Sequence, residues 1–240
     1  MKHFNWTNIR LILMLATVAF LFSFTSNRNN NRKLKKISIV FVGNDAPFVD
    51  QETVNKLLIE NKKDAQSINK DKLDLNKLES LLNTQEMIEK SEVFVSVDGV
   101  LKAVVKQKTP VARFFDGDDS FYIDYEGNTM PLSTNFTARV PIVSGEINRK
   151  DSKDLAELFR IIHDDAFLKK NIIGVQIMPN RSLLMLSRNY NYKIDFGRAI
   201  KIKAKFNNYK AVFQKAVLDS SLNKYKIIDL RFTHQVVCTK

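Results

Sequence analysis

One segment near the N-terminus limits what this chain can become. Residues Leu11 to Phe24 form a run of 14 residues without a charge. Basic residues flank the run on both sides: Lys2 and Arg10 before it, and Arg28, Arg32, Lys33, Lys35 and Lys36 after it. An apolar run with basic flanks at this place in a chain is either a cleavable signal peptide or a membrane anchor. Either reading directs the chain to a membrane.

The residues around the end of the run favour an anchor that is not cleaved. Phenylalanines crowd the small residues near a possible cleavage position, and no A-x-A pattern is present. From Trp6 to Ser26 the chain has 21 residues, which as a helix at about 1.5 Å per residue would cross a hydrocarbon core of about 30 Å. We therefore predict a short cytoplasmic tail over residues 1–8 and a transmembrane anchor over 9–26.

The flanking charges bear on the orientation of this anchor. Two basic side chains precede the run and five follow it, so the positive-inside rule taken literally would place the C-terminus in the cytoplasm. The rule weakens for long translocated domains, and a short positive region before an apolar core is typical of a signal anchor. We expect a cytoplasmic N-terminus, with the rest of the chain outside the cytoplasm.

Charge elsewhere argues against several classes of function. The chain has 38 Lys and Arg against 26 Asp and Glu, but the excess is confined to its two ends. A nucleic-acid-binding protein should carry a basic face through its folded body, so no nucleic-acid partner is expected. A hydrophobic content of 44% excludes a disordered chain. One cysteine, Cys238, excludes an internal disulfide framework and a cysteine-based zinc site.

The residues after the anchor predict a small α+β unit. Lys35 to Val42 is an apolar run rich in Ile and Val, as in a buried strand. Helices are predicted to begin after Asp50 and Asp74, because each Asp lies between apolar residues that are placed as a hydrophobic staple. The polar residues 61–72 between the helices are expected to form a solvated loop.

A β-hairpin is predicted to complete this unit. Glu92 to Val97 and Val100 to Lys106 are β-branched runs on either side of Asp98-Gly99, a pair that fits a type I′ turn. The order β-α-α-β-β just outside a membrane anchor resembles a POTRA domain, here over residues 35–108. The next residues, LKAVVKQKTPVARFF (Leu101 to Phe115), resemble the junction that closes the POTRA domain of the cell-division family FtsQ/DivIB.

The second unit, residues 109–240, is similar to the same family along its length. Phe121 to Pro131 (FYIDYEGNTMP) resembles the family's strand-turn-strand, and Val140 to Gly145 (VPIVSG) its short Pro-containing strand. A helix capped by Asp151 or Ser152 is predicted next, with an apolar stripe that runs from Leu155 to Ala166. Further elements are expected near 173–178, 183–187, 192–196 and 200–218, then a strand over 224–232 with an Ile-Asp-Leu-Arg core, and a short segment over 235–240. The predicted fold class is α+β, with a mainly antiparallel sheet in this second domain.

Residue types suited to catalysis are scarce. The histidines are His3, His163 and His234. The acidic residues 116–119 lack the Gly and Glu spacing of an EF-hand, and the scattered glycines form no phosphate-binding loop. We expect neither an enzyme nor a bound metal or cofactor.

Two features could contact a partner. The helix over 200–218 is expected to bury Ile202, Phe206, Tyr209, Phe213 and Val217 and to expose Lys201, Lys203, Lys205, Lys210 and Lys215. That basic face is either simply solvated or faces an acidic segment of another protein. The last strand is expected at a sheet edge, where a partner strand could add main-chain hydrogen bonds; the alternative is that it merely closes the core.

The residues expected at this partner-binding surface are Arg231, Phe232, Gln235, Val236, Val237, Lys201 and Lys205. Phe232 and Val236 are predicted as apolar anchors, and the basic residues as contacts for acidic groups. Proline at Val237 is expected to remove one edge amide.

Resemblance to the FtsQ/DivIB family implies a function. It implies a bitopic scaffold of the bacterial divisome in the inner membrane, enriched at the division site, with periplasmic domains. The implied partners are bitopic coiled-coil division proteins of the FtsB and FtsL type and septal peptidoglycan-synthesis proteins. The alternative is an envelope assembly or transport factor whose POTRA-like unit holds client strands.

Overall fold

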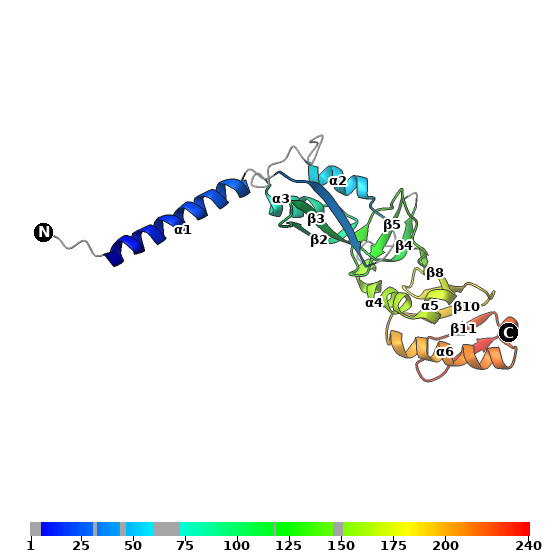
Figure 1. The fold of residues 1–240 in the computed structure, drawn as a ribbon. Helices are drawn as coiled ribbons and strands as arrows, with labels where there is room; N and C mark the ends of the chain where they lie inside the picture. The colour runs from blue at the N-terminus through cyan, green and yellow to red at the C-terminus, as the bar shows by residue number, and fades with distance from the viewer. Residues whose placement is uncertain (1–5, 31–32, 44–46, 60–72, 118, 146–150) are drawn as a thin grey trace. The chain divides into compact units, whose positions relative to one another are not determined.

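The computed structural model (Figure 1) describes residues 6–30, 33–43, 47–59, 73–117, 119–145 and 151–240. The chain divides into two compact units, each with its own hydrophobic core. The first comprises Met1–Asp45 with Val49–Gln107, and the second comprises Ala46–Phe48 with Lys108–Lys240. The loop predicted over residues 61–72 lies outside the described residues.

The N-terminal helix, α1, runs over Trp6–Asn30. Within the described residues it is the one helix long and apolar enough to cross a membrane, over Asn8–Ser26, and none of that stretch is buried against the rest of the protein. The Arg10 guanidinium lies 5.7 Å from the ring of Trp6. A cation stacked on an amphipathic aromatic ring suits the polar boundary of a bilayer.

The first unit pairs three strands and two helices. The strands are β1 (Lys36–Val42), β2 (Ile88–Val95) and β3 (Val100–Gln107), in the order β1-β3-β2. β1 runs parallel to β3, which requires a crossover connection; α2 (Gln51–Ile59) and α3 (Leu75–Asn83) lie in that crossover. The order β-α-α-β-β is the one predicted from the sequence.

The starts of both helices are capped as predicted. An Asp50 Oδ1 accepts a hydrogen bond from the backbone N–H of Thr53 at 2.7 Å. In the same way Asp74 accepts from the N–H of Lys77 at 3.0 Å. Each bond satisfies one of the amides that a first helical turn leaves without an intrahelical partner.

The hairpin turn differs from the prediction. A type I′ turn needs positive φ at both central residues, but among the described residues of this turn only Gly99 has one, at 85°. Its N–H bonds to the carbonyl of Ser96 at 3.0 Å. The connection is therefore a longer loop that ends in a left-handed glycine. Asp98, the other central residue of the predicted turn, does not adopt positive φ, so the type I′ geometry does not form.

The second unit is built on a nine-stranded sheet in the order β12-β11-β10-β9-β8-β7-β4-β5-β6. Its strands are β4 (Pro110–Asp116), β5 (Asp119–Asp124), β6 (Thr129–Met130), β7 (Ile142–Gly145), β8 (Ile172–Ile177), β9 (Leu183–Ser187), β10 (Lys193–Gly197), β11 (Ile227–Asp229) and β12 (Val237–Thr239). Its helices are α4 (Asp151–Asp164), α5 (Ala166–Asn171), α6 (Ile202–Leu218) and the 3-10 turn η3 (Leu222–Lys224). Most pairings among these described strands are antiparallel, and the fold class is α+β as predicted.

Two element boundaries were predicted wrongly. The helix expected to reach Ala166 ends at Asp164, because the Asp165 carboxylate accepts from the backbone amides of Phe167 and Leu168 and so begins α5. The strand expected over 224–232 is reduced to β11. It ends there because the side chain of Asp229 accepts from the backbone N–H of Arg231 at 2.9 Å, a turn-forming contact.

Candidate partner-binding edge

The last strand, β12, lies at one edge of the nine-stranded sheet. It pairs antiparallel with β11, with Asp229 opposite Val237 and Ile228 opposite Cys238. Among the described strands none pairs with its other side. A strand in this position can accept a further strand from a partner.

Side chains along β12 alternate between core and solvent. Val237 is 44% exposed, and Gln235 is also exposed. Val236 and Cys238 are half-buried and pack against the core of the second unit. Val236, predicted as an apolar anchor, contributes part of its side chain to the core, and its contact with a partner stays a prediction. Phe232, which is 49% exposed, and Val237 are exposed apolar side chains near this edge.

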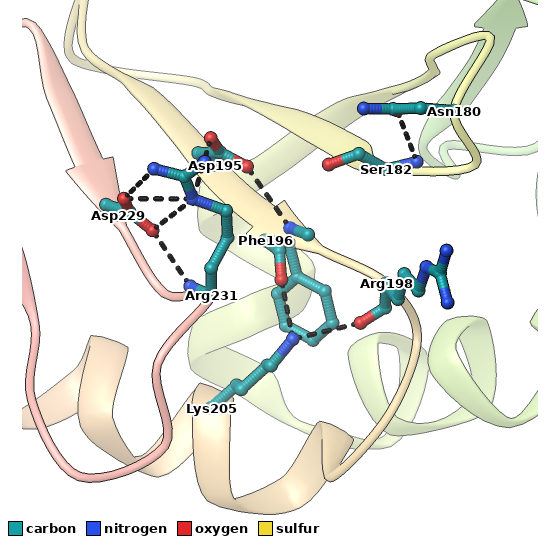
Figure 2. A network of polar contacts seen from close by, with 9 residues as sticks. Asn180, Ser182, Asp195, Phe196, Arg198, Lys205, Asp229 and Arg231 are labelled. Atoms are coloured by element: carbon teal, nitrogen blue, oxygen red, sulfur yellow. Dashed lines mark hydrogen bonds and ion pairs between the residues drawn. The ribbon is translucent and has the colours of Figure 1, made fainter.

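Arg231 was predicted to meet acidic residues of a partner, but its guanidinium is already occupied. Its Nη2 donates to the Asp229 carboxylate at 2.6 Å, and its Nε lies 3.4 Å from an oxygen of Asp195 (Figure 2). The hydrogen bonds from Arg231 hold the pKa of Asp229 below its ordinary value. The pair joins the ends of β10 and β11. Because 55% of the Arg231 side chain is exposed, its contact with a partner stays a prediction.

Lys205 departs furthest from the sequence prediction. It was expected on the exposed basic face of α6, but only 2% of it is exposed. Its Nζ donates to the backbone carbonyls of Phe196 at 2.7 Å and Arg198 at 2.9 Å (Figure 2). The ammonium also lies 4.8 Å from the ring of Phe196, and burial lowers its pKa. Lys205 is thus unable to meet a partner.

The buried stripe of α6 explains this correction. Its buried residues are Ile202, Lys205, Phe206, Tyr209 and Ala216. Position 205 follows the first of these by three, which is the spacing of residues on one helix face. The spacing therefore indicates a buried position, but a lysine there was expected to be exposed. Val217, predicted to be buried, is 49% exposed for the same reason, since Ala216 takes the inward position.

The end of β10 packs closely against the residues that follow β11. Gly197 has φ of 68°, and a Cβ added there would lie 2.8 Å from the Cγ of Arg231. Its N–H bonds to the carboxylate of Asp195 at 3.2 Å. Lys201, also predicted at the partner surface, is exposed and has φ of 51° at the start of α6. It lies on a different element from the edge strand.

One contact near the edge was missed in the sequence. The side-chain amide of Asn208 on α6 donates to the carbonyl of Thr233 at 2.9 Å. This bond fixes the loop between β11 and β12, which carries Phe232. An amide side chain beside a buried helical stripe is the sequence signal that could have indicated a tie to a loop.

The remaining basic and acidic side chains serve local structure. Lys210 forms an ion pair with Asp165, the cap of α5. Asp164 accepts from the hydroxyl of Tyr125 at 2.7 Å and lies 3.1 Å from His163. Within the part of the chain that the structure describes, no group of three or more His, Cys, Asp and Glu side chains is arranged to hold a metal ion.

These features define a class before any comparison: an α+β protein whose N-terminal apolar helix fits a single-pass membrane anchor. A protein-family model described as FtsQ/DivIB, C-terminal related, matches residues 109–239. The chain belongs to this family. Membership indicates a role in cell division, and it confirms the resemblance found in the sequence.

Among solved structures, a similar one is the major extracytoplasmic domain of the trans isomer of the bacterial cell-division protein DivIB from Geobacillus stearothermophilus. The two share 13% sequence identity, with a TM-score of 0.32. The similarity covers 47% of this chain and 95% of that chain. No curated protein sequence matches the chain.

Proposed function

We propose that this protein is a bitopic, non-enzymatic scaffold of the bacterial divisome, which recruits and links septal division proteins through its extracytoplasmic domains. The observation that carries the proposal is the family match over residues 109–239, which contains the whole nine-stranded sheet and its open edge at β12. The apolar helix α1 supports the anchored arrangement.

The proposed topology follows from the anchor. Residues 1–8 form a cytoplasmic tail and 9–26 cross the inner membrane. A POTRA-like domain over 35–108 and a C-terminal β domain over 109–240 lie in the periplasm at the division site. Sequencing the N-terminus of the mature protein tests the anchor, because a chain that begins near Ser26 would mean that the apolar segment is removed.

The proposed partners of β12 are bitopic coiled-coil division proteins of the FtsB and FtsL type. The open edge of β12 supports main-chain pairing with an extended partner segment, in which alternate side chains read its identity. Gln235, Val237 and Phe232 are exposed and suited to contact it. The POTRA-like unit is proposed to contact septal peptidoglycan-synthesis proteins.

Site-specific photocrosslinking in dividing cells tests this proposal. A photoreactive amino acid replaces Val237 on β12 in the full chain, and a matched control replaces Thr129 on β6, the exposed strand at the opposite edge of the same sheet. We expect adducts with small bitopic coiled-coil division proteins from position 237 and none from 129. Adducts with barrel precursors would favour an envelope assembly factor instead, and equal labelling from both edges would contradict docking at β12.

A further inference from the structure

The chain enters the first unit at one particular end of its three-stranded sheet. The backbone N–H of Lys35 donates to the carbonyl of Gly99 at 2.8 Å, and Lys36 at the start of β1 is in register with Val100 at the start of β3. The residues that lead out of α1 therefore lie beside the turn between β2 and β3. We call this part of the unit, residues 33–36 and 94–102, its entry end.

Chain length keeps the entry end near the membrane if α1 is the anchor of the proposed function, on which this inference rests. The apolar stretch of α1 ends at Ser26 and the helix at Asn30. Four helical residues advance about 6 Å and three further residues reach at most about 11 Å. Lys33 thus lies within about 17 Å of the hydrocarbon boundary, and the headgroup layer occupies the first 5 to 7 Å, roughly, of that distance.

Positive charge is concentrated at the entry end. The exposed basic side chains there are Lys33, Lys35, Lys36 and Lys102. Asp98 is the acidic residue of the turn, and its pKa is lowered by a hydrogen bond with Ser96 and by the nearby charges of Lys35 and Lys102. The four lysines outnumber the one carboxylate, so the entry end carries a net positive charge.

Exposed apolar side chains accompany these charges. Val97 is 85% exposed at the tip of the turn. Phe94 is 43% exposed on β2 and is in register with Lys102 on β3. Leu34, by contrast, is 1% exposed and fixes the incoming chain to the core. Exposed apolar side chains among lysines match the chemistry of a membrane interface.

We infer that the entry end of the first unit docks on the anionic phospholipid headgroups of the membrane that α1 crosses, with Val97 at the interface. The lysines neutralise lipid phosphates, while Val97 and Phe94 lie at the level of the headgroups. Docking would fix the first unit at the membrane surface instead of leaving it free on a short tether. The positive-inside rule disfavours the excess of basic residues after the span. Binding of lipid phosphates by these residues would account for their presence outside the cytoplasm.

Fluorescence of the full chain in lipid nanodiscs tests this inference. Cys238→Ser removes the native thiol, and Val97→Cys carries an environment-sensitive fluorophore. Nanodiscs contain phosphatidylcholine alone or phosphatidylcholine with phosphatidylglycerol. We expect blue-shifted emission and quenching by a lipid-borne quencher in the anionic discs only. The signal should be lost when salt is raised from about 0.1 M to about 1 M, which shortens the Debye length from about 10 Å to about 3 Å.

Charge variants separate this docking from a general attraction. One variant changes Lys35, Lys36 and Lys102 together to Gln. It should lower the ratio of docked to undocked chain by on the order of a hundredfold, because each basic residue near the membrane surface raises that ratio about fivefold. The matched control changes Lys56, Lys90 and Lys106, three exposed lysines of the same unit outside its entry end, and should leave the signal in place. Circular dichroism confirms that both variants fold.

Two results would overturn the inference. One is equal quenching in neutral and anionic discs, and the other is equal loss of signal in the two triple variants. Failure of the chain to float with the discs would show that α1 does not anchor it. That result would contradict the anchor of the proposed function. It differs from a chain that floats with the discs but shows no quenching at position 97, which would contradict the docking alone.

Discussion

The ammonium of Lys205 donates to the backbone carbonyl of Phe196 across a distance of 2.7 Å, in a site that is almost completely buried. The same group donates to the carbonyl of Arg198. One side chain of α6 thereby joins the helix to the end of β10. A cation with two carbonyl partners and an aromatic ring is well compensated for the loss of water, although burial still lowers its pKa.

Lys205→Met should destabilise the fold by about 2 kcal/mol. The substitution keeps most of the buried volume but leaves the Phe196 carbonyl without this donor, and an unsatisfied buried group costs about 1–3 kcal/mol. Thermal unfolding of the full chain in detergent, followed by circular dichroism, measures the change. Lys203→Met on the exposed face of α6 is the control and should change stability by less than about 0.5 kcal/mol. Equal melting of the two variants would contradict the structural role of Lys205.

Gly197→Ala should destabilise the second unit through two separate effects. Its φ of 68° disfavours any L side chain, and the new Cβ would lie 2.8 Å from the Cγ of Arg231. Gly117→Ala is a matched control, because Gly117 has φ of 62° but no atom within 4 Å of the added Cβ. The control should cost about 1 kcal/mol from backbone conformation alone. Gly197→Ala should cost clearly more in the same denaturation measurement, and equal losses would mean that Arg231 moves aside freely.

Asp229→Asn should lower stability at neutral pH by about 2 kcal/mol, since a hydrogen bond to a charged group is worth about 1.5–3 kcal/mol. Because the folded-state pKa of Asp229 is depressed, its stabilisation is fully present above the ordinary value of 3.8 and is lost as pH falls through the lower folded value. The difference in unfolding free energy between wild type and variant should therefore be constant from pH 5 to 7, approximately, and shrink below 3.8. Asp119→Asn, at the exposed start of β5, is the control. A pH-independent difference would contradict the ion pair.

Asp74→Ala should remove the cap of α3 and cost about 1 kcal/mol, while Asp74→Asn should be nearly neutral because Asn caps equally well. Asp50→Ala should shift the melting temperature in the same direction, since Asp50 makes the equivalent bond at the start of α2. Unchanged melting of both alanine variants would show that these bonds do not stabilise the helices.

Local patterns in the sequence were sufficient for much of the fold. Caps at Asp50 and Asp74, the β-α-α-β-β order and an α+β second unit follow from short-range chemistry, which the sequence displays directly. Pairings between distant segments do not. The parallel contact of β10 with β11, for example, joins residues separated by the whole of α6, and no local pattern specifies it.

The candidate edge was predictable in position but less so in its chemistry. The sequence prediction placed the last strand at a sheet edge, and β12 lies there in the structure. The roles of these side chains depend on partners in other elements: Arg231 pairs with Asp195 on β10, and Lys205 on α6 donates to Phe196 on β10. Basic side chains were expected to be exposed. This expectation fails where another segment of the chain supplies carbonyl or carboxylate oxygens that compensate a buried cation for the loss of water.

The direction of the backbone amides corrects the proline test suggested by the sequence. The Asp195 carbonyl on β10 accepts from the N–H of Leu230 at 2.8 Å, so by alternation the polar groups of Asp229 point the other way, toward β12. Val237, opposite Asp229, therefore directs its N–H into the sheet. The N–H that points out of the open edge belongs to Cys238.

Proline at these two positions should consequently have opposite effects. Cys238→Pro removes the outward donor and keeps the pairing of Val237 with Asp229, so partner binding should fall while the melting temperature stays within a few degrees. Val237→Pro removes a bond within the sheet and should lower the melting temperature of the protein. Cys238→Ala controls for the loss of the half-buried thiol and should retain binding. Affinity of the purified full chain for an FtsB-type partner, measured in detergent by interferometry, separates the cases. If Cys238→Pro folds and binds as tightly as Cys238→Ala, the partner does not add a strand to β12.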